Sequence, residues 1–417
     1  MEQVIGVDAG APKDTEVLAE AGVELHLHED GVALLGRVRA VVKSPGVPAE
    51  AAAIAAARAR GMPVLGELEL GWRMLENEFI AVTGTNGKTT TVELIGHIHR
   101  EAGLPVAVAG NVGAAVSGLV EKLDMGTTVV CEVSSFQLED TVAFAPEAAV
   151  LLNVTPDHLD RHGTFAAYLA AKLEIFARQG NEDIAVAPLG LGSRIESPPI
   201  PPPIPGCARR VCFGEGAGAA LSLSAGELWW EERPLLRVDE IRLPGRHNVQ
   251  NAMAAAAVCL ARGIDIEAVR AGLRSFTGVK HRLEMLGRRD GVLWVNDSKA
   301  TNVASTVVAL DAFGAGAIHL ILGGQAKGQD FSALREPVQR RCEAVYLIGE
   351  DAPLIATALQ DVDVQMHECG ELERAVVRAR EAAGEGDVVL LSPACASFDQ
   401  FADFEARGER FRELVQG

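Results

Sequence analysis

The chain has 417 residues, enough for about two to four domains with a core each, and 48% of them are apolar. Its formal net charge of −19 argues against a nucleic-acid partner, because the phosphate backbone attracts basic proteins. Its apolar runs fall well short of the about 20 residues that a membrane-spanning helix needs, so we expect no membrane contact.

Seven cysteines are scattered along the chain without a C-x-x-C pair, as expected of buried thiols in a reducing compartment. The first residues, MEQ, lack the basic and apolar regions of a secretory signal. We therefore expect a cytoplasmic protein, and we expect it to be a monomer.

Lysine and asparagine are scarce: the chain has 8 Lys among its 38 basic residues, and 9 Asn. Half of the lysines nevertheless fall in Gly/Thr/Asn-rich stretches, at Lys88, Lys172, Lys299 and Lys327. Arg cannot replace Lys at a phosphate point contact or where a neutral amine is needed, so this clustering indicates a chemical requirement. Chance clustering is the alternative.

Short apolar runs alternate with helical patterns from end to end. The runs are continuous rather than alternating, which is typical of parallel strands covered on both faces. They are RAVVKSPG, FIAVTG, TTVVCEV, AAVLLNV, AIHLILGG, AVYLIGE and DVVLLSP. The pattern predicts an α/β fold of repeated βα units, with ligand sites at the carboxyl ends of the strands.

Two breaks divide this pattern, where the helical GELELGWRMLENE gives way to a strand around 72–78, and at FTGVKHRLE around 276–282. We therefore expect three domains, over residues 1–73, 74–277 and 278–417. Inside the middle domain, the proline cluster PPIPPPIP (198–205) predicts a stiff loop. The following ELWWEERPLLRV predicts antiparallel strands of a small β subsheet.

The stretch EFIAVTGTNGKTTT, residues 78–91, has the context of a phosphate-binding loop, between a strand and a helix. Its glycines let backbone N–H groups face the phosphates, Lys88 supplies a point charge, and Thr89 can ligate Mg²⁺. Val82 stands where the usual pattern has its first glycine, so the loop is a variant. A chance glycine-rich turn is the alternative. The candidate phosphate-binding residues are Gly84, Thr85, Asn86, Gly87, Lys88, Thr89 and Thr90.

Two later strand ends carry candidate metal ligands. Glu132 ends the strand TTVVCEV, and beside a phosphate loop such a carboxylate is placed to hold Mg²⁺; a solvated cap is the alternative. His158 and His162 are spaced i, i+4, but the Glu of H-E-x-x-H is missing, so the spacing does not indicate zinc. Lys172 lies in a helical stretch, where an ordinary surface lysine is the alternative.

The remaining polar clusters lie further along the chain. Asn248 and Asn251 share one face of a starting helix, although Asn is a poor helix former, which indicates polar recognition. Three predicted strand ends in the last domain carry WVNDSKATN, LILGGQAKGQDF and LLSPACASFDQFADF. Together they predict a binding site lined with hydrogen-bond donors and suited to an anionic amino acid.

Taken in order, these motifs resemble those of the Mur ligases of bacterial cell-wall synthesis, over essentially residues 40–417. The matching stretches are GTNGKTTT, GNVG (110–113), EVSSFQLE, NVTPDHLDRH, AAKLEIF, GRHNVQNAMAAAA, KHRLE, NDSKATN, LGGQAKGQDF and SPACASFDQF. EVSSFQLE, NDSKATN and SPACASFDQF look like the D-glutamate-adding branch of that family.

The resemblance implies three domains: a Rossmann-like domain for a UDP-sugar, a central ATPase with a small β subsheet, and a C-terminal Rossmann-like domain. It implies that ATP phosphorylates the terminal carboxylate of UDP-MurNAc-L-Ala, and that the amine of D-glutamate attacks the acyl phosphate. It also implies two Mg²⁺ sites, one of which uses a carbamylated lysine.

Carried over motif by motif, the resemblance assigns roles to individual residues. Thr89 and Glu132 hold one Mg²⁺, while His158 and the carbamate of Lys172 belong to the second; Lys88, Glu132, His158 and Lys172 form the catalytic group. Asn251, Arg282, Asp297 and Lys299 join the loop in contacting ATP. Contacts to UDP-MurNAc-L-Ala fall on Ser44, Pro45, Gly46, Asn111, Ser134, Gln137 and His158. The D-glutamate pocket falls on Thr301, Lys327, Ser397, Phe398 and Phe404.

The sequence departs from the family at two places. Gln325 stands where members often carry an acidic residue. The opening MEQVIGVDAGAPKD lacks the G-x-G-x-S-G turn that cradles UDP, so we expect a shortened first domain that starts at the family's second strand. A degenerate version of the first turn in VIGVDAG is the alternative. Two alternatives stay open: a sister ligase, Mur or folylpolyglutamate type, with another acceptor, and a P-loop ATPase without ligase activity.

Overall fold

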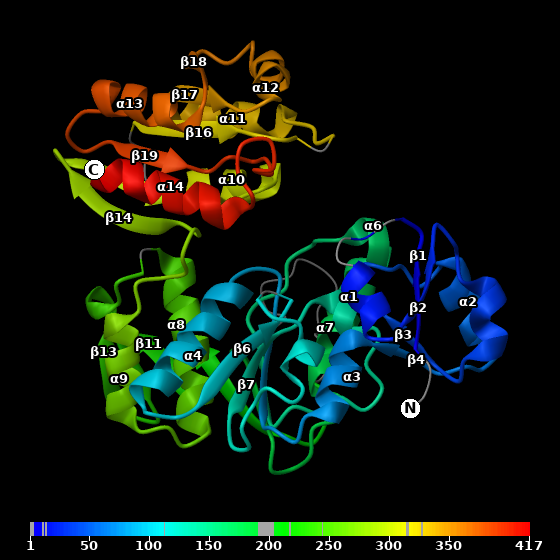
Figure 1. The fold of residues 1–417 in the computed structure, drawn as a ribbon. Helices are drawn as coiled ribbons and strands as arrows, with labels where there is room; N and C mark the ends of the chain where they lie inside the picture. The colour runs from blue at the N-terminus through cyan, green and yellow to red at the C-terminus, as the bar shows by residue number, and fades with distance from the viewer. Residues whose placement is uncertain are drawn as a thin grey trace. The chain divides into compact units, whose positions relative to one another are not determined.

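The computed structural model describes residues 4–10, 12, 15–111, 113–190, 204–216, 218–243, 245–313, 317–326 and 328–417. The chain divides into two compact units, Met1–Ile241 with Arg246–Ser275, and Arg242–Gly245 with Phe276–Gly417 (Figure 1). The second unit begins beside the boundary predicted after residue 277. The boundary predicted after residue 73 falls inside the first unit and stays a prediction.

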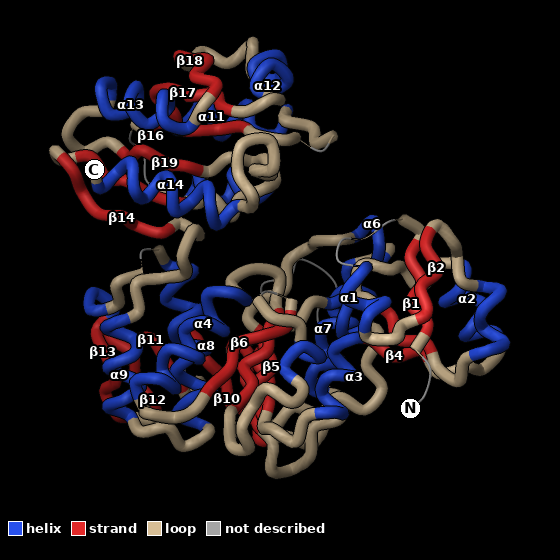
Figure 2. Tube along the Cα trace, in the orientation of Figure 1, coloured by secondary structure: helices blue, strands red, loops and turns tan. Residues whose placement is uncertain are grey.

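The N-terminal part of the first unit contains two pairs of parallel strands, β1 with β2 and β3 with β4 (Figure 2). Its elements are β1 (Ile5–Asp8), α1 (Thr15–Glu20), β2 (Glu24–Leu27), β3 (Val41–Lys43), α2 (Ala52–Ala59), β4 (Val64–Gly66) and α3 (Glu67–Met74). β3 confirms the strand predicted in RAVVKSPG, and α3 confirms the helix in GELELGWRMLENE. The missing first strand of the family stays a prediction.

Buried charges connect this part to the rest of the first unit. Lys43 at the end of β3 forms a 2.5 Å ion pair with Asp140, and both side chains are buried. Glu69 on α3, also buried, accepts hydrogen bonds from the backbone N–H groups of Val142, Ala143 and Phe144. A carboxylate removed from water needs such donors, so these contacts fix the position of the segment that follows β3.

A nine-stranded sheet forms the centre of the first unit, in the order β13-β12-β11-β10-β9-β8-β5-β7-β6. Its strands are β5 (Phe79–Thr83), β6 (Val106–Gly110), β7 (Thr128–Glu132), β8 (Ala148–Leu151), β9 (Ile184–Pro188), β10 (Arg209–Gly214), β11 (Leu221–Ser224), β12 (Glu227–Trp230) and β13 (Arg233–Arg237). β5 and β8 are wholly buried, which is why FIAVTG and AAVLLNV are continuous apolar runs. The predicted antiparallel strands are β12 and β13, and with β11 they continue the parallel sheet at one edge.

The helices of this sheet are α4 (Lys88–Glu101), α5 (Ser135–Leu138), α6 (Leu159–His162), α7 (Phe165–Leu173), α8 (Arg246–Ala261) and α9 (Ile266–Ser275). α4 packs on both α8 and α9. The stiff loop predicted at 198–205 lies mostly outside the described residues. None of the described helices is both long and apolar enough to cross a bilayer.

The second unit is built on a six-stranded sheet in the order β14-β15-β19-β16-β17-β18, parallel except for β14. Its strands are β14 (Glu284–Arg289), β15 (Val292–Asn296), β16 (Ile318–Gly323), β17 (Cys342–Ile348), β18 (Gln365–Gly370) and β19 (Val388–Leu391). Its helices are α10 (Val303–Asp311), α11 (Arg335–Arg341), α12 (Ala352–Ala358), α13 (Leu372–Ala382) and α14 (Phe404–Gln416). Separate apolar clusters cover the two faces of this sheet, as the runs AIHLILGG, AVYLIGE and DVVLLSP predicted.

Candidate active site

The predicted phosphate loop joins β5 to α4 at the carboxyl end of the nine-stranded sheet. Gly87 caps α4 with a φ of 87°, in the left-handed region that favours glycine. The Lys88 ammonium donates to the carbonyl oxygens of Gly84 and Thr85, at 3.0 Å each, so it lies back over the loop. The Asn153 side chain closes the loop from β8, because its amide exchanges two 2.9 Å hydrogen bonds with the backbone of Asn86.

Glu132 lies beside this loop, at the end of β7 and next to β5. The Thr89 hydroxyl donates to Glu132 Oε2 at 2.8 Å, and Asn111 Nδ2 donates to Oε1 at 3.1 Å. The Glu132 side chain is almost wholly buried. A hydroxyl and a carboxylate in contact are hard oxygen donors of the type that Mg²⁺ prefers, so the two predicted ligands fit that ion.

Lys172 approaches the same loop from α7. It is 2% exposed, and its Nζ donates to the Gly84 carbonyl oxygen at 2.8 Å. Burial, reinforced by the charge of Lys88, lowers the pKa of the Lys172 ammonium to about 7. Burial in this site rules out the alternative of an ordinary surface lysine.

Tyr168 contacts both Lys172 and the loop. Lys172 Nζ lies 4.6 Å from the centre of the Tyr168 ring, and the Tyr168 hydroxyl is 3.0 Å from Thr85 Oγ1. His158 also lies near this ring, with 6.4 Å between the ring centres. Lys172 and His158, predicted for the second metal, are thus neighbours of one aromatic ring.

The two histidines of the segment differ in environment. His158 is half exposed and caps α6 with a φ of 50°. His162 is buried, with its ring nitrogens 3.0 Å from Ser135 Oγ and from Glu139 Oε1, and burial lowers the pKa of its imidazole. His158 is therefore the histidine available to a ligand, whereas both ring nitrogens of His162 are already engaged by Ser135 and Glu139.

The residues predicted for the UDP-sugar also belong to the first unit. Ser134 and Gln137 form a capping box at α5, in which Gln137 Oε1 accepts from the Ser134 N–H and hydroxyl. The side-chain oxygen of the buried Gln137 is therefore engaged in capping α5. Ser44, Pro45 and Gly46 follow Lys43, whose ammonium also donates to the Val47 carbonyl oxygen at 2.8 Å.

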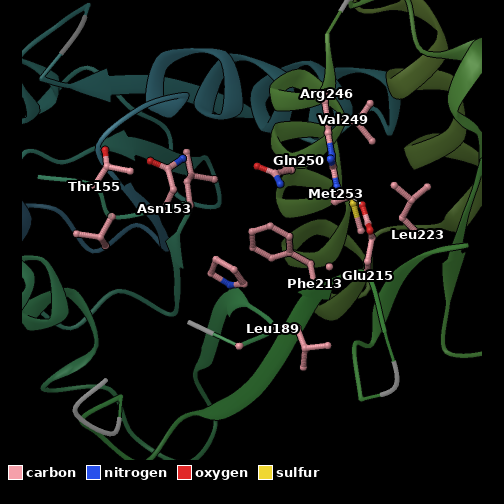
Figure 3. Close-up of a pocket in the computed structure, with 15 residues that line it drawn as sticks. Asn153, Thr155, Leu189, Phe213, Glu215, Leu223, Arg246, Val249, Gln250 and Met253 are labelled. Atoms are coloured by element: carbon pink, nitrogen blue, oxygen red, sulfur yellow. Dashed lines mark hydrogen bonds and ion pairs between the residues drawn. The ribbon is translucent and has the colours of Figure 1, made fainter. Parts of the chain in front are cut away.

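A pocket of about 360 Å³ adjoins the loop at the ends of β8, β9 and β10 (Figure 3). Asn153 and Thr155 line one side, and Gln250 on α8 lies opposite them. The other lining residues include the apolar Leu189, Phe213, Leu223 and Met253. Asn251, the neighbour of Gln250, abuts the loop and bonds to Asn248 at 3.2 Å, which places both amides on one face of α8 as predicted.

The other predicted residues belong to the second unit. Asp297 follows β15 and is buried; it accepts from the Leu283 N–H at 3.0 Å and from the Ser392 hydroxyl at 2.8 Å. Burial raises the pKa of its carboxyl to about 7, although Arg282 opposes the shift. Lys299 lies with its Nζ 5.9 Å from the centre of the Phe404 ring.

Phe404 is one of the residues predicted for D-glutamate, and the other described ones lie in the loops after β15 and β19. Ser397 is buried and Phe398 is 56% exposed, and both follow β19. Thr301 lies two residues beyond Lys299, and its N–H donates a hydrogen bond to the Lys299 carbonyl oxygen. Lys327 lies outside the described residues. Gln325, the departure from the family, donates to Glu350 at 3.2 Å, so a carboxylate still lies beside that position.

Sequence reasoning missed three residues that hold these sites together: Tyr168, Asn153 as the partner of Asn86, and Arg407 on α14. Tyr168 could have been identified from the sequence, since it precedes Lys172 by one helical turn and is one of only two tyrosines. No local sequence pattern identifies Arg407, because its partners Ser298 and Cys395 are 109 and 12 residues away.

Fold and site together define a class: a phosphate-loop ATPase domain joined to a second α/β domain. The sequence profile of the Mur ligase middle domain matches residues 82–191, and that of the Mur ligase glutamate ligase domain matches residues 281–395. The chain is 42% identical to UDP-N-acetylmuramoylalanine–D-glutamate ligase of Pelotomaculum thermopropionicum, over 99% of this chain and 92% of that protein. It is 45% identical to the ligase of that name from Anaeromyxobacter dehalogenans, over 90% and 83% of the two chains.

Solved structures agree on the fold. MurF ligase of Thermotoga maritima in complex with ADP superposes with a TM-score of 0.59 at 18% identity, over 100% of this chain and 94% of that one. UDP-N-acetylmuramate–alanine ligase MurC of the same organism superposes with a TM-score of 0.58 at 20% identity, over 99% of this chain and 93% of that one. The chain belongs to the Mur ligase family, and within it to the group of the UDP-N-acetylmuramoylalanine–D-glutamate ligases.

Proposed function

We propose that this protein joins D-glutamate to UDP-N-acetylmuramoyl-L-alanine at the expense of ATP, a step of peptidoglycan synthesis. The observation that carries the proposal is the 42% identity with such a ligase over 99% of the chain. That match spans the phosphate-loop unit and the second unit alike. A resemblance confined to the loop would support only ATP binding.

The chemistry starts from an unreactive carboxylate. An oxygen of the L-alanyl carboxylate attacks the γ-phosphorus of ATP, and ADP leaves. The neutral amine of D-glutamate then attacks the acyl carbon, and inorganic phosphate leaves with the C–O electron pair as the amine gives up a proton. Phosphorylation thus converts a carboxylate oxygen into a leaving group.

In this proposal the loop positions the phosphates. The N–H groups at the start of α4 face the β- and γ-phosphates, and Lys88 exchanges its contacts with Gly84 and Thr85 for phosphate oxygens. Thr89 and Glu132 hold a Mg²⁺ ion, which when bound neutralises charge on the phosphates. The adjoining pocket takes the adenosine, because it is lined by Asn153, whose side chain closes the loop at Asn86.

Lys172 acts in the proposal as a carbamate. An amine adds CO₂ only when it is neutral: its lone pair forms the N–C bond, one proton leaves, and a negative carboxylate results. A pKa of about 7 leaves a large neutral fraction at neutral pH, whereas an ordinary lysine is almost wholly protonated. The carbamate and His158 would then serve the second Mg²⁺, to which the carbamate supplies a hard oxygen ligand of the kind this ion prefers.

The amino acid binds the second unit in this scheme. Lys299, Thr301, Lys327, Ser397, Phe398 and Phe404 contact D-glutamate or the nucleotide, and Arg282 and Asp297 contact ATP. Ser44, Pro45 and Gly46 receive the diphosphate of the UDP-sugar, and Asn111, Ser134, Gln137 and His158 receive its MurNAc-L-Ala portion.

The test is phosphate release from ATP in the presence of UDP-MurNAc-L-Ala and D-glutamate, with each omitted in turn. We expect release only with all three present. Release that depends equally on L-alanine or a diamino acid would point to a sister ligase. Release without any amino acid, or none with all three substrates, would overturn the proposal.

A further inference from the structure

Arg407 lies near the start of α14 and is 1% exposed. Its guanidinium donates to Ser298 twice, to Oγ and to the carbonyl oxygen, at 2.9 Å each. It also donates to the carbonyl oxygens of Cys395 at 3.0 Å and Ala396 at 3.4 Å. Within the described part of the chain, no carboxylate forms an ion pair with it; burial lowers its pKa, and the nearby charge of Asp399 opposes that shift without a direct contact. Carbonyl and hydroxyl oxygens therefore solvate a buried positive charge.

The acceptors of this guanidinium belong to two different loops. Ser298 lies in the loop after β15, between Asp297 and Lys299, and Cys395 and Ala396 lie in the loop after β19. The Ser298 hydroxyl also donates to the Phe404 carbonyl oxygen at 2.8 Å, which adds the start of α14. One side chain thus joins three segments, and each segment carries a residue of the proposed amino acid site.

Hydrogen bonds from Gln325 and, more weakly, from Arg407 set the direction of the peptide group that follows Ala396. The Ala396 carbonyl oxygen accepts from Arg407 and from the Gln325 N–H, the latter at 2.9 Å. In a planar trans peptide the next N–H points the opposite way, so the Ser397 N–H faces away from Arg407. It donates to none of the described residues, although Ser397 is buried. A buried N–H without an acceptor suits an anionic oxygen of a ligand.

We propose that Arg407 is a positioning residue for the amino acid substrate, whose guanidinium holds the two loops so that the Ser397 N–H meets a carboxylate of that substrate. The inference rests on the proposed function. Burying a charge without a directly paired carboxylate is costly, and a fixed geometry of the two loops is the gain that offsets this cost. Lysine cannot supply it, because an ammonium has three donors at one point and no planar fork.

The experiment compares Arg407→Lys and Arg407→Met with Arg410→Met as the control. Arg410 lies on the same helix, half exposed, and pairs with Glu373 and Glu413. Initial rates of phosphate release give kcat and a KM for each substrate. We expect both Arg407 variants to raise the KM for D-glutamate at least about tenfold, and to change the KM for UDP-MurNAc-L-Ala less than about twofold. A merely structural role would lower the active fraction and the melting temperature without that selectivity.

Hydrogen exchange of the free protein supplies a readout that needs no turnover. We expect faster exchange over 297–302 and 394–404 in Arg407→Lys, which keeps the charge and most of the volume, and unchanged exchange there in Arg410→Met. A D-glutamate KM within about twofold of the wild type in Arg407→Lys would overturn the inference alone. A wild-type protein that releases no phosphate with D-glutamate would overturn the proposed function, and the inference with it.

Discussion

Lys172 Nζ donates to the Gly84 carbonyl oxygen across 2.8 Å, although 88 residues separate the two in the chain. Gly84 opens the phosphate loop, so the lysine on α7 and the loop form one structure. A carbamate keeps one N–H on that nitrogen, and the bond to Gly84 is therefore compatible with the modified form. The contact places the new carboxylate beside the loop that holds the phosphates.

Lys172→Arg is expected to lower kcat at least about 100-fold, because a guanidinium adds no CO₂ and stays positive. Lys172→Ala is expected to be as inactive, and formate or acetate is expected to restore part of its activity by occupying the vacated site. Phosphate-release assays with and without these anions measure both effects. Lys122→Ala, at an exposed lysine, is the control and keeps wild-type rates. An active Lys172→Arg would show that the carbamate role is wrong.

The parts of the fold that sequence predicted are those set by local composition. β5 and β8 are apolar at every position because both of their faces are covered, and the loop at Gly84–Thr90 needs glycine, lysine and threonine wherever it occurs. The helix placement of Asn248 and Lys172 followed from the same local signals. Neighbouring residues decide these features, so the chain displays them directly.

The parts that sequence did not predict depend on distant partners. Asn153 was noticed as a scarce residue, but its pairing with Asn86 spans 67 positions, and the bonds of Arg407 to Ser298 span 109. An arginine in a helix is predicted to lie at the surface unless its hydrogen-bond acceptors are known. The capping box of Ser134 and Gln137 has a recognisable local pattern. It was not predicted because the same two residues were assigned to substrate contacts.

Gly87→Ala is expected to weaken nucleotide binding strongly. Its φ of 87° is strained for alanine, and an added Cβ would stand 2.2 Å from Asn251 Oδ1, so the loop or α8 must shift. Isothermal titration calorimetry with ADP is expected to show a loss of affinity of at least about 30-fold, or roughly 2 kcal/mol.

Gly103→Ala is the matched control for this loop variant. Gly103 follows the other end of α4 with a φ of 69°, and an added Cβ there meets nothing within 4 Å. It is expected to cost about 1 kcal/mol of unfolding free energy and to leave nucleotide affinity unchanged. Equal nucleotide affinity in both variants would contradict the predicted role of the loop.

Tyr168→Phe is expected to lower kcat about three- to tenfold, because it removes the bond to Thr85 Oγ1 but keeps the ring against Lys172. Tyr168→Ala removes the ring as well and is expected to lower kcat much further. The control is Tyr346→Phe, at the only other tyrosine, whose hydroxyl is 2.9 Å from His319 Nδ1 in the core of the second unit. It is expected to lower the melting temperature without a change in kcat. Equal kcat in Tyr168→Phe and wild type would show that the hydroxyl does not position the loop.

Asp297→Asn is expected to stabilise the protein and to inactivate it. Burial raises the pKa of this carboxyl to about 7 in the folded state, above the ordinary value of 3.8. Between these two values the unfolded chain ionises first, so stability falls as pH rises from about 4 to 7, and the loss is complete above pH 7. An amide has no charge to bury, and the Ser392 hydroxyl can rotate from donor to acceptor to meet the new NH₂ group.

The stabilisation should therefore depend on pH in a defined direction. At pH 8 the amide is expected to raise the unfolding free energy of the second unit by an amount on the order of 1 kcal/mol or more, and at pH 4 to leave it nearly unchanged. Differential scanning calorimetry at both pH values measures this, with Asp290→Asn in an exposed turn as the control, expected to be neutral at both. Phosphate release by Asp297→Asn is expected to be lost, because the proposed ATP contact needs the carboxylate. A larger stabilisation at pH 4 than at pH 8 would show that the folded carboxyl is not the group with the raised pKa.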